Sequence, residues 1–307
     1  MEPIRTLDQL LESLKGEPPR KVAIAAGHDP HSIQAAARAA REGIARMLLV
    51  GDRQRIESLC ADFGIDPETF TILDEPDDSK AGVRARDLVV SGQADVLMKG
   101  LISTDKYMRL ILDKEKGLLP KGSVLTHVTV LDMPEFQRLH GKLLFVSDVA
   151  IIPAPDLPTK VKIANCAIAA ARSFGIDKPR VAILAATEKV SDRMSATTDA
   201  AILAKMGDRG QLAGAIVDGP LALDVAISPE ACAIKGLVSP VEGSADVLVF
   251  PNIEAANAFY KAATYLAGGR LAGAVIGTSA PCVLTSRADS EESKLYSIAL
   301  GCRLVKG

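Results

Sequence analysis

Short apolar runs alternate with longer amphipathic stretches along most of this sequence. The runs are rich in β-branched residues, as in KVAIAAG over residues 21–27 and ADVLMKG over 94–100. Residues 29–43 have the spacing of an amphipathic helix, with Asp29 as its N-cap and Pro30 at its first position. Near-continuously apolar strands separated by helices predict a mostly parallel sheet with helices on both faces.

The alternation weakens between about residues 114 and 158, where two apolar segments lie close together with little helical pattern between them. Three prolines then fall within residues 150–159. The alternation resumes beyond them, with strands predicted at 180–187, 213–219, 245–251 and 271–277. We therefore expect two similar α/β layers, with the first domain crossing near residues 150–159, and ligand binding at the carboxyl ends of the strands.

Composition narrows the classes of partner. The chain has 307 residues, 48% of them apolar and 24% charged, and a formal net charge of −2. These are the proportions of a globular protein, and the charge gives no sign of a nucleic-acid or membrane-surface partner. Aromatic residues make up only 4%, without tryptophan, which argues against a platform on which bases stack. The longest apolar stretches fall short of a membrane span, and the five scattered cysteines favour reduced thiols in a cytoplasmic protein.

Several familiar catalytic motifs are missing from the sequence. No G-x-G-x-x-G follows a strand, and no H-E-x-x-H or G-x-S-x-G motif occurs. Residues 117–122 have the glycine spacing of a P-loop, but Ser123 occupies the position of its lysine. His, Cys and carboxylate residues do not cluster with metal-ligand spacing. We therefore expect no metal site and no standard dinucleotide site.

A first polar cluster follows the predicted strand at 245–251. In a helix beginning near residue 252, Asn257 and Lys261 lie on one face with Tyr260 beside them. An amide, a phenol and an ammonium group near a strand end can bind an anion or a polar carbonyl. The alternative is a surface helix with a solvated lysine and a half-buried tyrosine.

Three further polar clusters follow predicted strands. Thr285, Ser286 and Arg287 end an apolar run before a helix start, where a guanidinium can bind phosphate in a planar fork. The alternative is an ordinary capped loop with a surface arginine. Arg109 comes two turns into a helix after the strand at 94–100, and Thr187 and Lys189 follow the strand at 180–187. Four such clusters in an Ala-, Val- and Leu-rich chain point to a site for an anionic ligand.

At these residues the chain resembles the phosphate acetyltransferase / phosphate butyryltransferase family. The resemblance covers roughly residues 15–305 and is strongest at 218–236, 245–262 and 280–300. The segment Thr-Glu-Lys-Val, which contains Lys189, resembles the butyryl branch of the family. Acetyl members usually carry a Ser/Thr/Gly-rich turn at this position. Ala256 stands where the family often has glycine, and Ser293 where acetyl members carry a catalytic acid, so that carboxylate has no counterpart here.

The resemblance implies a fold, an activity and an assembly. The fold is a two-domain, three-layer α/β/α architecture like that of isocitrate and isopropylmalate dehydrogenases, with the active site in the interdomain cleft. The first domain spans 1–147 and 273–307, and the second, inserted domain spans 148–272. The implied activity is reversible transfer of an acetyl or butyryl group between coenzyme A and inorganic phosphate, in a homodimer without cofactors.

The resemblance also implies roles for the polar residues. Arg287 would bind the phosphate, and Ser286 would donate to the departing sulfur or to the oxyanion. Arg109 would pair with a phosphate, of coenzyme A or of the attacking group. The remaining residues expected to bind substrate are Asn257, Tyr260, Lys261, Thr187, Lys189 and Thr285.

Two other functions remain open from the sequence. One is an NAD- and metal-dependent β-decarboxylating dehydrogenase on the same fold, with Asp218 and Asp224 as metal ligands. The other is a non-catalytic protein that binds coenzyme A or another anion, a reading favoured by Ser293 in place of the acid.

Overall fold

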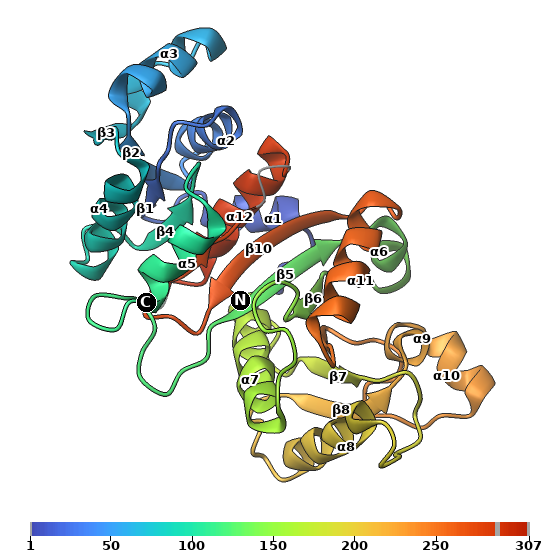
Figure 1. Cartoon of the computed structure of the whole chain (residues 1–307). Coiled ribbons are helices and arrows are strands. Elements are labelled where there is room, and N and C mark those ends of the chain that lie inside the picture. The colour runs from blue at the N-terminus through green and yellow to red at the C-terminus, as the bar shows by residue number, and fades with distance from the viewer. Residues whose placement is uncertain (1, 286–288, 306–307) are drawn as a thin grey trace. The chain divides into compact units, whose positions relative to one another are not determined.

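The computed structural model describes residues 2–285 and 289–305 and forms two compact units (Figure 1). The terminal unit consists of residues 7–125 and 271 onward, and the inserted unit consists of residues 126–270 together with the chain up to Thr6. The sequence placed the first boundary at 147/148, whereas this division falls at 125/126. The difference arises because the strands at 126–132 and 144–147 pair within the inserted unit.

The terminal unit contains a sheet with strand order β3-β2-β1-β4-β11-β10. All neighbouring strands are parallel except β11 and β10, which are antiparallel. The strands are β1 (Arg20–Ala25), β2 (Ala45–Gly51), β3 (Thr71–Asp74), β4 (Val96–Lys99), β10 (Arg270–Ile276) and β11 (Cys282–Val283). The helices are α1 (Leu7–Leu14), α2 (Pro30–Arg41), α3 (Arg53–Phe63), α4 (Asp78–Val90), α5 (Thr104–Leu112) and α12 (Glu291–Arg303), with a 3-10 turn at Pro67–Thr69.

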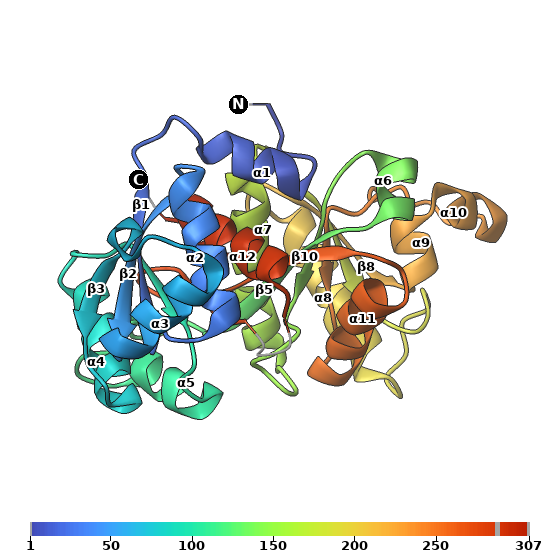
Figure 2. The same cartoon turned by 90° about the horizontal axis from the view of Figure 1, so that it is seen from above.

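Helix α2 shows how local sequence sets these boundaries. The Asp29 carboxylate accepts a hydrogen bond from the backbone N–H of Ser32 over 3.0 Å, and Pro30 begins the helix, both as predicted. The apolar face of α2, including Ile33 and Ala36, is fully buried. Helix α12 packs beside α2, as Figure 2 shows. Helix α12 also contacts β1, β2, β4 and β11, so it lies against the sheet of the terminal unit.

The loops that follow β1 and β4 are joined closely at the carboxyl edge of this sheet. The backbone N–H groups of Gly100 and Leu101 donate to the carbonyls of Ala25 and Ala26 over 2.9 and 2.8 Å. A Cβ atom at Gly100 would collide with the Ala26 carbonyl oxygen. Only glycine allows this approach, so Gly100 fixes the position from which the chain continues into α5.

The inserted unit contains a sheet with strand order β5-β6-β9-β7-β8. β5 and β6 are antiparallel, and the other neighbouring pairs are parallel. The strands are β5 (Thr126–Asp132), β6 (Leu144–Ser147), β7 (Arg180–Leu184), β8 (Ile216–Leu221) and β9 (Val247–Val249). The helices are α6 (Pro134–His140), α7 (Leu157–Ser173), α8 (Ser195–Asp208), α9 (Leu223–Ile227), α10 (Pro229–Lys235) and α11 (Ile253–Tyr265).

Helices cover the sheet of the inserted unit along its length. Helix α7 packs on β5, β6 and β9, α8 on β7 and β8, and α11 on β5 and β6. The sequence pattern missed α6, because this seven-residue helix is too short to show a helical period. The α/β class with mostly parallel strands is confirmed in both units. No helix among the described residues is long and apolar enough to cross a membrane.

Candidate functional site

The carboxyl ends of β6, β9, β7 and β8 lie at one edge of the inserted unit's sheet, because these strands run parallel. Helix α11 starts from this edge after β9, with the Asn252 carboxamide oxygen capping the Ala255 N–H over 3.0 Å. The predicted helix is confirmed, so Asn257, Tyr260 and Lys261 share the expected spacing. Asn257 and Tyr260 are half-buried and Lys261 is exposed.

The amide of Asn257 is held by the loop that follows β6. Its Nδ2 donates to the backbone carbonyl of Val149 over 3.0 Å. That loop is organised by Asp148, which is 4% exposed and accepts hydrogen bonds from Thr126, His127, Ala150 and Ile151. Sequence reasoning missed Asp148. The Ser147–Asp148–Val149 segment ends an apolar run as the other strand-end clusters do, and this was the available signal.

The turn after β7 carries two more of the predicted residues at the same edge. The backbone N–H of Lys189 donates to Thr187 Oγ1 over 3.3 Å; Thr187 is half-buried and Lys189 is exposed. Glu188 between them lies 3.1 Å from Lys235 Nζ. Burial raises the pKa of Glu188, but the hydrogen bond and positive charge of Lys235, together with a backbone hydrogen bond, outweigh burial, and the net pKa is lowered. The turn thus presents a cation and a hydroxyl beside an anchored carboxylate.

The carboxyl edge of the terminal unit carries the remaining described residues. Thr285 follows β11 and is 5% exposed, and β11 is paired with β4. Arg109 is exposed on α5, the helix that follows β4. Ser286 and Arg287, the predicted catalytic residues, lie outside the described residues.

Two buried lysines at this edge were missed from the sequence. Lys99 ends β4, is 3% exposed and donates from Nζ to the Gly100 carbonyl over 3.2 Å. Lys294 in the first turn of α12 is 4% exposed and donates to Thr285 Oγ1 over 3.2 Å. Burial lowers the pKa of Lys294, whereas the negative charges of Asp29 and Asp289 raise it. A lysine directly after the apolar residues 96–98 was the signal for Lys99.

The structure therefore divides the predicted site residues by unit. Five lie in the inserted unit, namely Asn257, Tyr260, Lys261, Thr187 and Lys189. Arg109 and Thr285 lie in the terminal unit. Within each unit the described residues come from elements that start at the carboxyl edge of parallel strands.

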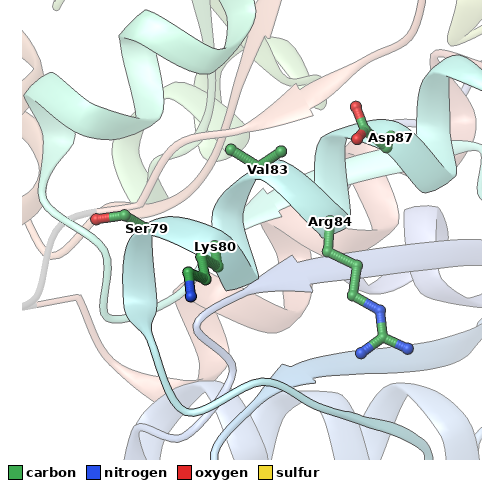
Figure 3. Close-up of a pocket in the computed structure, with 5 residues that line it drawn as sticks. All are labelled: Ser79, Lys80, Val83, Arg84 and Asp87. Atoms are coloured by element: carbon green, nitrogen blue, oxygen red, sulfur yellow. The ribbon is translucent and has the colours of Figure 1, made fainter.

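A surface hollow of about 340 Å³ on α4 contains none of the predicted residues. Figure 3 shows Val83 and Asp87 on one side of the helix, with Lys80 and Arg84 projecting from the other. Lys106 of α5 reaches the Ser79 hydroxyl at the start of α4 over 2.8 Å. The hollow lies on the helix surface, and its lining includes no residue of β4 or β11.

The two aspartates considered as metal ligands both have protein partners. Asp218 accepts from the Ser239 hydroxyl over 2.6 Å and from the Gly219 N–H over 2.8 Å. Asp224 pairs with Lys235 over 2.9 Å. Within residues 2–285 and 289–305, no group of three or more His, Cys, Asp or Glu side chains could hold a metal ion.

The chain has two α/β units, each with polar side chains at the carboxyl ends of parallel strands. This arrangement is typical of α/β enzymes. The family described as phosphate acetyl/butaryl transferase matches residues 5–84 and 77–302. The chain belongs to this family and is a phosphate acyltransferase. The resemblance drawn from the sequence is thus confirmed.

Individual relatives match over nearly the whole chain. The phosphate butyryltransferase of Clostridium acetobutylicum is 43% identical over 304 residues, covering 99% of both chains. The phosphate acetyltransferase of Thermotoga maritima is 42% identical over 294 residues, covering 96% of this chain and 98% of its own. The crystal structure of a branched-chain phosphotransacylase from Enterococcus faecalis has a TM-score of 0.81 at 32% identity, covering 93% of this chain and 99% of that one.

The fold also extends to dehydrogenases, as expected from the sequence. The crystal structure of a 4-hydroxythreonine-4-phosphate dehydrogenase from Klebsiella pneumoniae has a TM-score of 0.57 at 14% identity and covers 94% of this chain. At this level of identity the likeness concerns the fold alone.

Proposed function

We propose that this chain catalyses the reversible reaction of a short-chain acyl-CoA with inorganic phosphate, giving an acyl phosphate and coenzyme A. The observation that carries the proposal is the match to the phosphate acetyl/butaryl transferase family over residues 5–84 and 77–302. Similar relatives include both a phosphate butyryltransferase at 43% and a phosphate acetyltransferase at 42% identity, which supports a short acyl group such as butyryl or acetyl.

The proposed chemistry needs groups that bind anions and stabilise an oxyanion. A phosphate oxygen attacks the thioester carbonyl carbon, which forms a C–O bond and a tetrahedral oxyanion. The oxyanion collapses, the C–S bond breaks, and coenzyme A leaves as a thiolate that is protonated by water. The protein orients the two substrates and neutralises the charge that develops.

The predicted residues supply these groups in the proposed mechanism. Arg287 binds the attacking phosphate, and Ser286 donates to the departing sulfur or the oxyanion. Asn257, Tyr260 and Lys261 bind the phosphate and the carbonyl, and Arg109 pairs with a phosphate group. Thr187, Lys189 and Thr285 contribute further contacts to the substrates. A homodimer is part of the proposal and can be tested by sedimentation velocity.

The test is phosphate-dependent thiol release from acetyl-, propionyl-, butyryl- and acetoacetyl-CoA. We expect release only with phosphate present, together with an acyl phosphate that hydroxylamine traps as a hydroxamate. One methylene group in an apolar pocket changes kcat/KM by about 10- to 200-fold, so the preferred chain length will be clear. Thiol release that does not depend on phosphate, or coenzyme A binding without release, would overturn the proposal.

A further inference from the structure

The ammonium group of Lys294 is buried against the hydroxyl of Thr285. The two atoms, Nζ and Oγ1, lie 3.2 Å apart, and the residues are only 4% and 5% exposed. Thr285 comes at the end of β11, and Lys294 in the first turn of α12. Their hydrogen bond therefore spans the connection in which Ser286 and Arg287 occur.

Burying the Lys294 side chain in its charged form is energetically unfavourable. Burial disfavours the ammonium form, and the first turn of a helix carries the positive end of the helix dipole. The neighbouring charges of Asp29 and Asp289 favour the ammonium. Asp29 Oδ2 is itself buried and accepts no hydrogen bond within the described part of the chain, although Oδ1 caps α2. A buried cation held in place by acidic neighbours is typical of functional sites.

The hydroxyl of Thr285 has a proton to donate. It uses its oxygen to accept the hydrogen bond from Lys294, and that is the one hydrogen bond it makes among residues 2–285 and 289–305. Buried hydroxyl groups normally find an acceptor for their own proton. An ammonium group donating to the oxygen also polarises the O–H bond, which makes the hydroxyl a stronger donor to an anion.

We propose that Thr285 and Lys294 form a donor relay for the phosphate substrate: the Thr285 hydroxyl contacts the phosphate, and Lys294 orients and polarises that hydroxyl. Lys294 is thus a positioning residue that acts through Thr285. The inference rests on the proposed function, whose phosphate co-substrate provides the anion. The charged side chain of Lys294 follows Ser293 directly in the sequence. Ser293 stands where acetyl members of the family carry an acid.

The test compares Thr285→Val, Lys294→Met and the double variant by their KM values for phosphate and for acyl-CoA. We expect each single variant to raise the KM for phosphate about tenfold or more, with the KM for acyl-CoA within about twofold. Because Lys294 acts through Thr285, the double variant should lose no more than the worse single variant. Thr285→Ser and Lys294→Arg, which keep the hydroxyl and the charge, should restore most of the affinity.

Matched substitutions at exposed positions, Thr71→Val and Lys205→Met, control for general effects of these changes. A second readout is the rise in unfolding temperature caused by inorganic phosphate, relative to sodium chloride of equal ionic strength. It should be present in the wild type and reduced in Thr285→Val and Lys294→Met, even if no acyl transfer is detected. Unchanged phosphate dependence in these two variants, or effects that multiply in the double variant, would overturn the relay.

Discussion

Asn257 donates a hydrogen bond from its side-chain Nδ2 to the backbone carbonyl of Val149 over 3.0 Å. This bond joins α11 to the loop that Asp148 organises after β6, so the amide is oriented by the sheet edge. A carboxylate in its place cannot donate to Val149 and adds a negative charge near the proposed phosphate site. Substitution of Asn257 therefore tests whether its side chain binds the phosphate.

We expect Asn257→Asp to raise the KM for phosphate at least about tenfold, and Asn257→Ala to raise it less, because alanine removes the amide without adding repulsion. Steady-state thiol release at varied phosphate measures both. Asn165→Asp, an exposed substitution on α7, controls for the added charge. Equal phosphate KM values in the wild type and Asn257→Asp would mean that Asn257 has only a structural role, which is to connect α11 to the loop.

Replacement of Arg287 by alanine should lower turnover on the order of 100-fold or more, the loss expected for one charged donor to the transition state. The assay is thiol release from acyl-CoA with saturating phosphate. Arg138→Ala removes an exposed arginine paired with Glu135 and is the matched control. Activity of Arg287→Ala within about threefold of the wild type would remove Arg287 from the mechanism.

A chelator should leave the reaction intact. In the proposed mechanism, side-chain cations neutralise the phosphate, and the thioester is attacked directly. Thiol release should therefore be the same before and after treatment with EDTA and desalting. Activity that falls on chelation and returns with a divalent cation would require a metal in the catalytic step.

The sequence predicted the sheet better than it predicted the arrangement of the site. Helix α2, with Asp29 and Pro30 at its start, could be predicted because capping residues and apolar period agree locally. The antiparallel pairing of β5 with β6 could not, because it depends on contacts between strands that share the same apolar composition.

Among the candidate site residues, Asn257 and Thr187 could be proposed from the sequence because polar groups directly after apolar strands are visible in one dimension. Lys294 and Asp148 were missed because their importance comes from burial and from partners elsewhere in the chain. Lys294 lies in a stretch of charged and hydroxyl residues that resembles a solvated helix start. Only the packing of α12 shows that this lysine is buried against Thr285.

Two cysteines should resist modification until the protein unfolds. Burial raises the pKa of Cys282 and of Cys302 to about 12, so their thiolate population at pH 8 is negligible. Cys166 is half-buried on α7 and should react first with Ellman's reagent. Peptide mapping should show Cys282 and Cys302 labelled only in denaturant, and Cys166→Ser should lose the fast phase. Labelling of Cys282 in the native enzyme would contradict its burial.

The stability of the inserted unit should depend on pH through Lys142, whose Nζ lies 2.7 Å from Asp246 Oδ1 and 2.8 Å from the Ser244 carbonyl. Burial lowers the pKa of Lys142 from 10.5, and the Asp246 charge only partly opposes this. Between the lowered pKa and 10.5, the unfolded chain therefore holds a proton that the folded chain has released. In that window the contribution of Lys142 to the free energy of unfolding rises with pH.

Urea unfolding of the wild type and of Lys142→Met at a series of alkaline pH values up to 10.5 measures this contribution. The other titrating groups are common to both proteins, so the difference in free energy of unfolding isolates Lys142. We expect that difference to shift in favour of the wild type as the pH rises, because the cost of burying the charge disappears. Lys205→Met, an exposed substitution, controls for the loss of one positive charge. A difference that moves toward Lys142→Met with rising pH would mean that the ion pair with Asp246, rather than burial, dominates the energetics of Lys142.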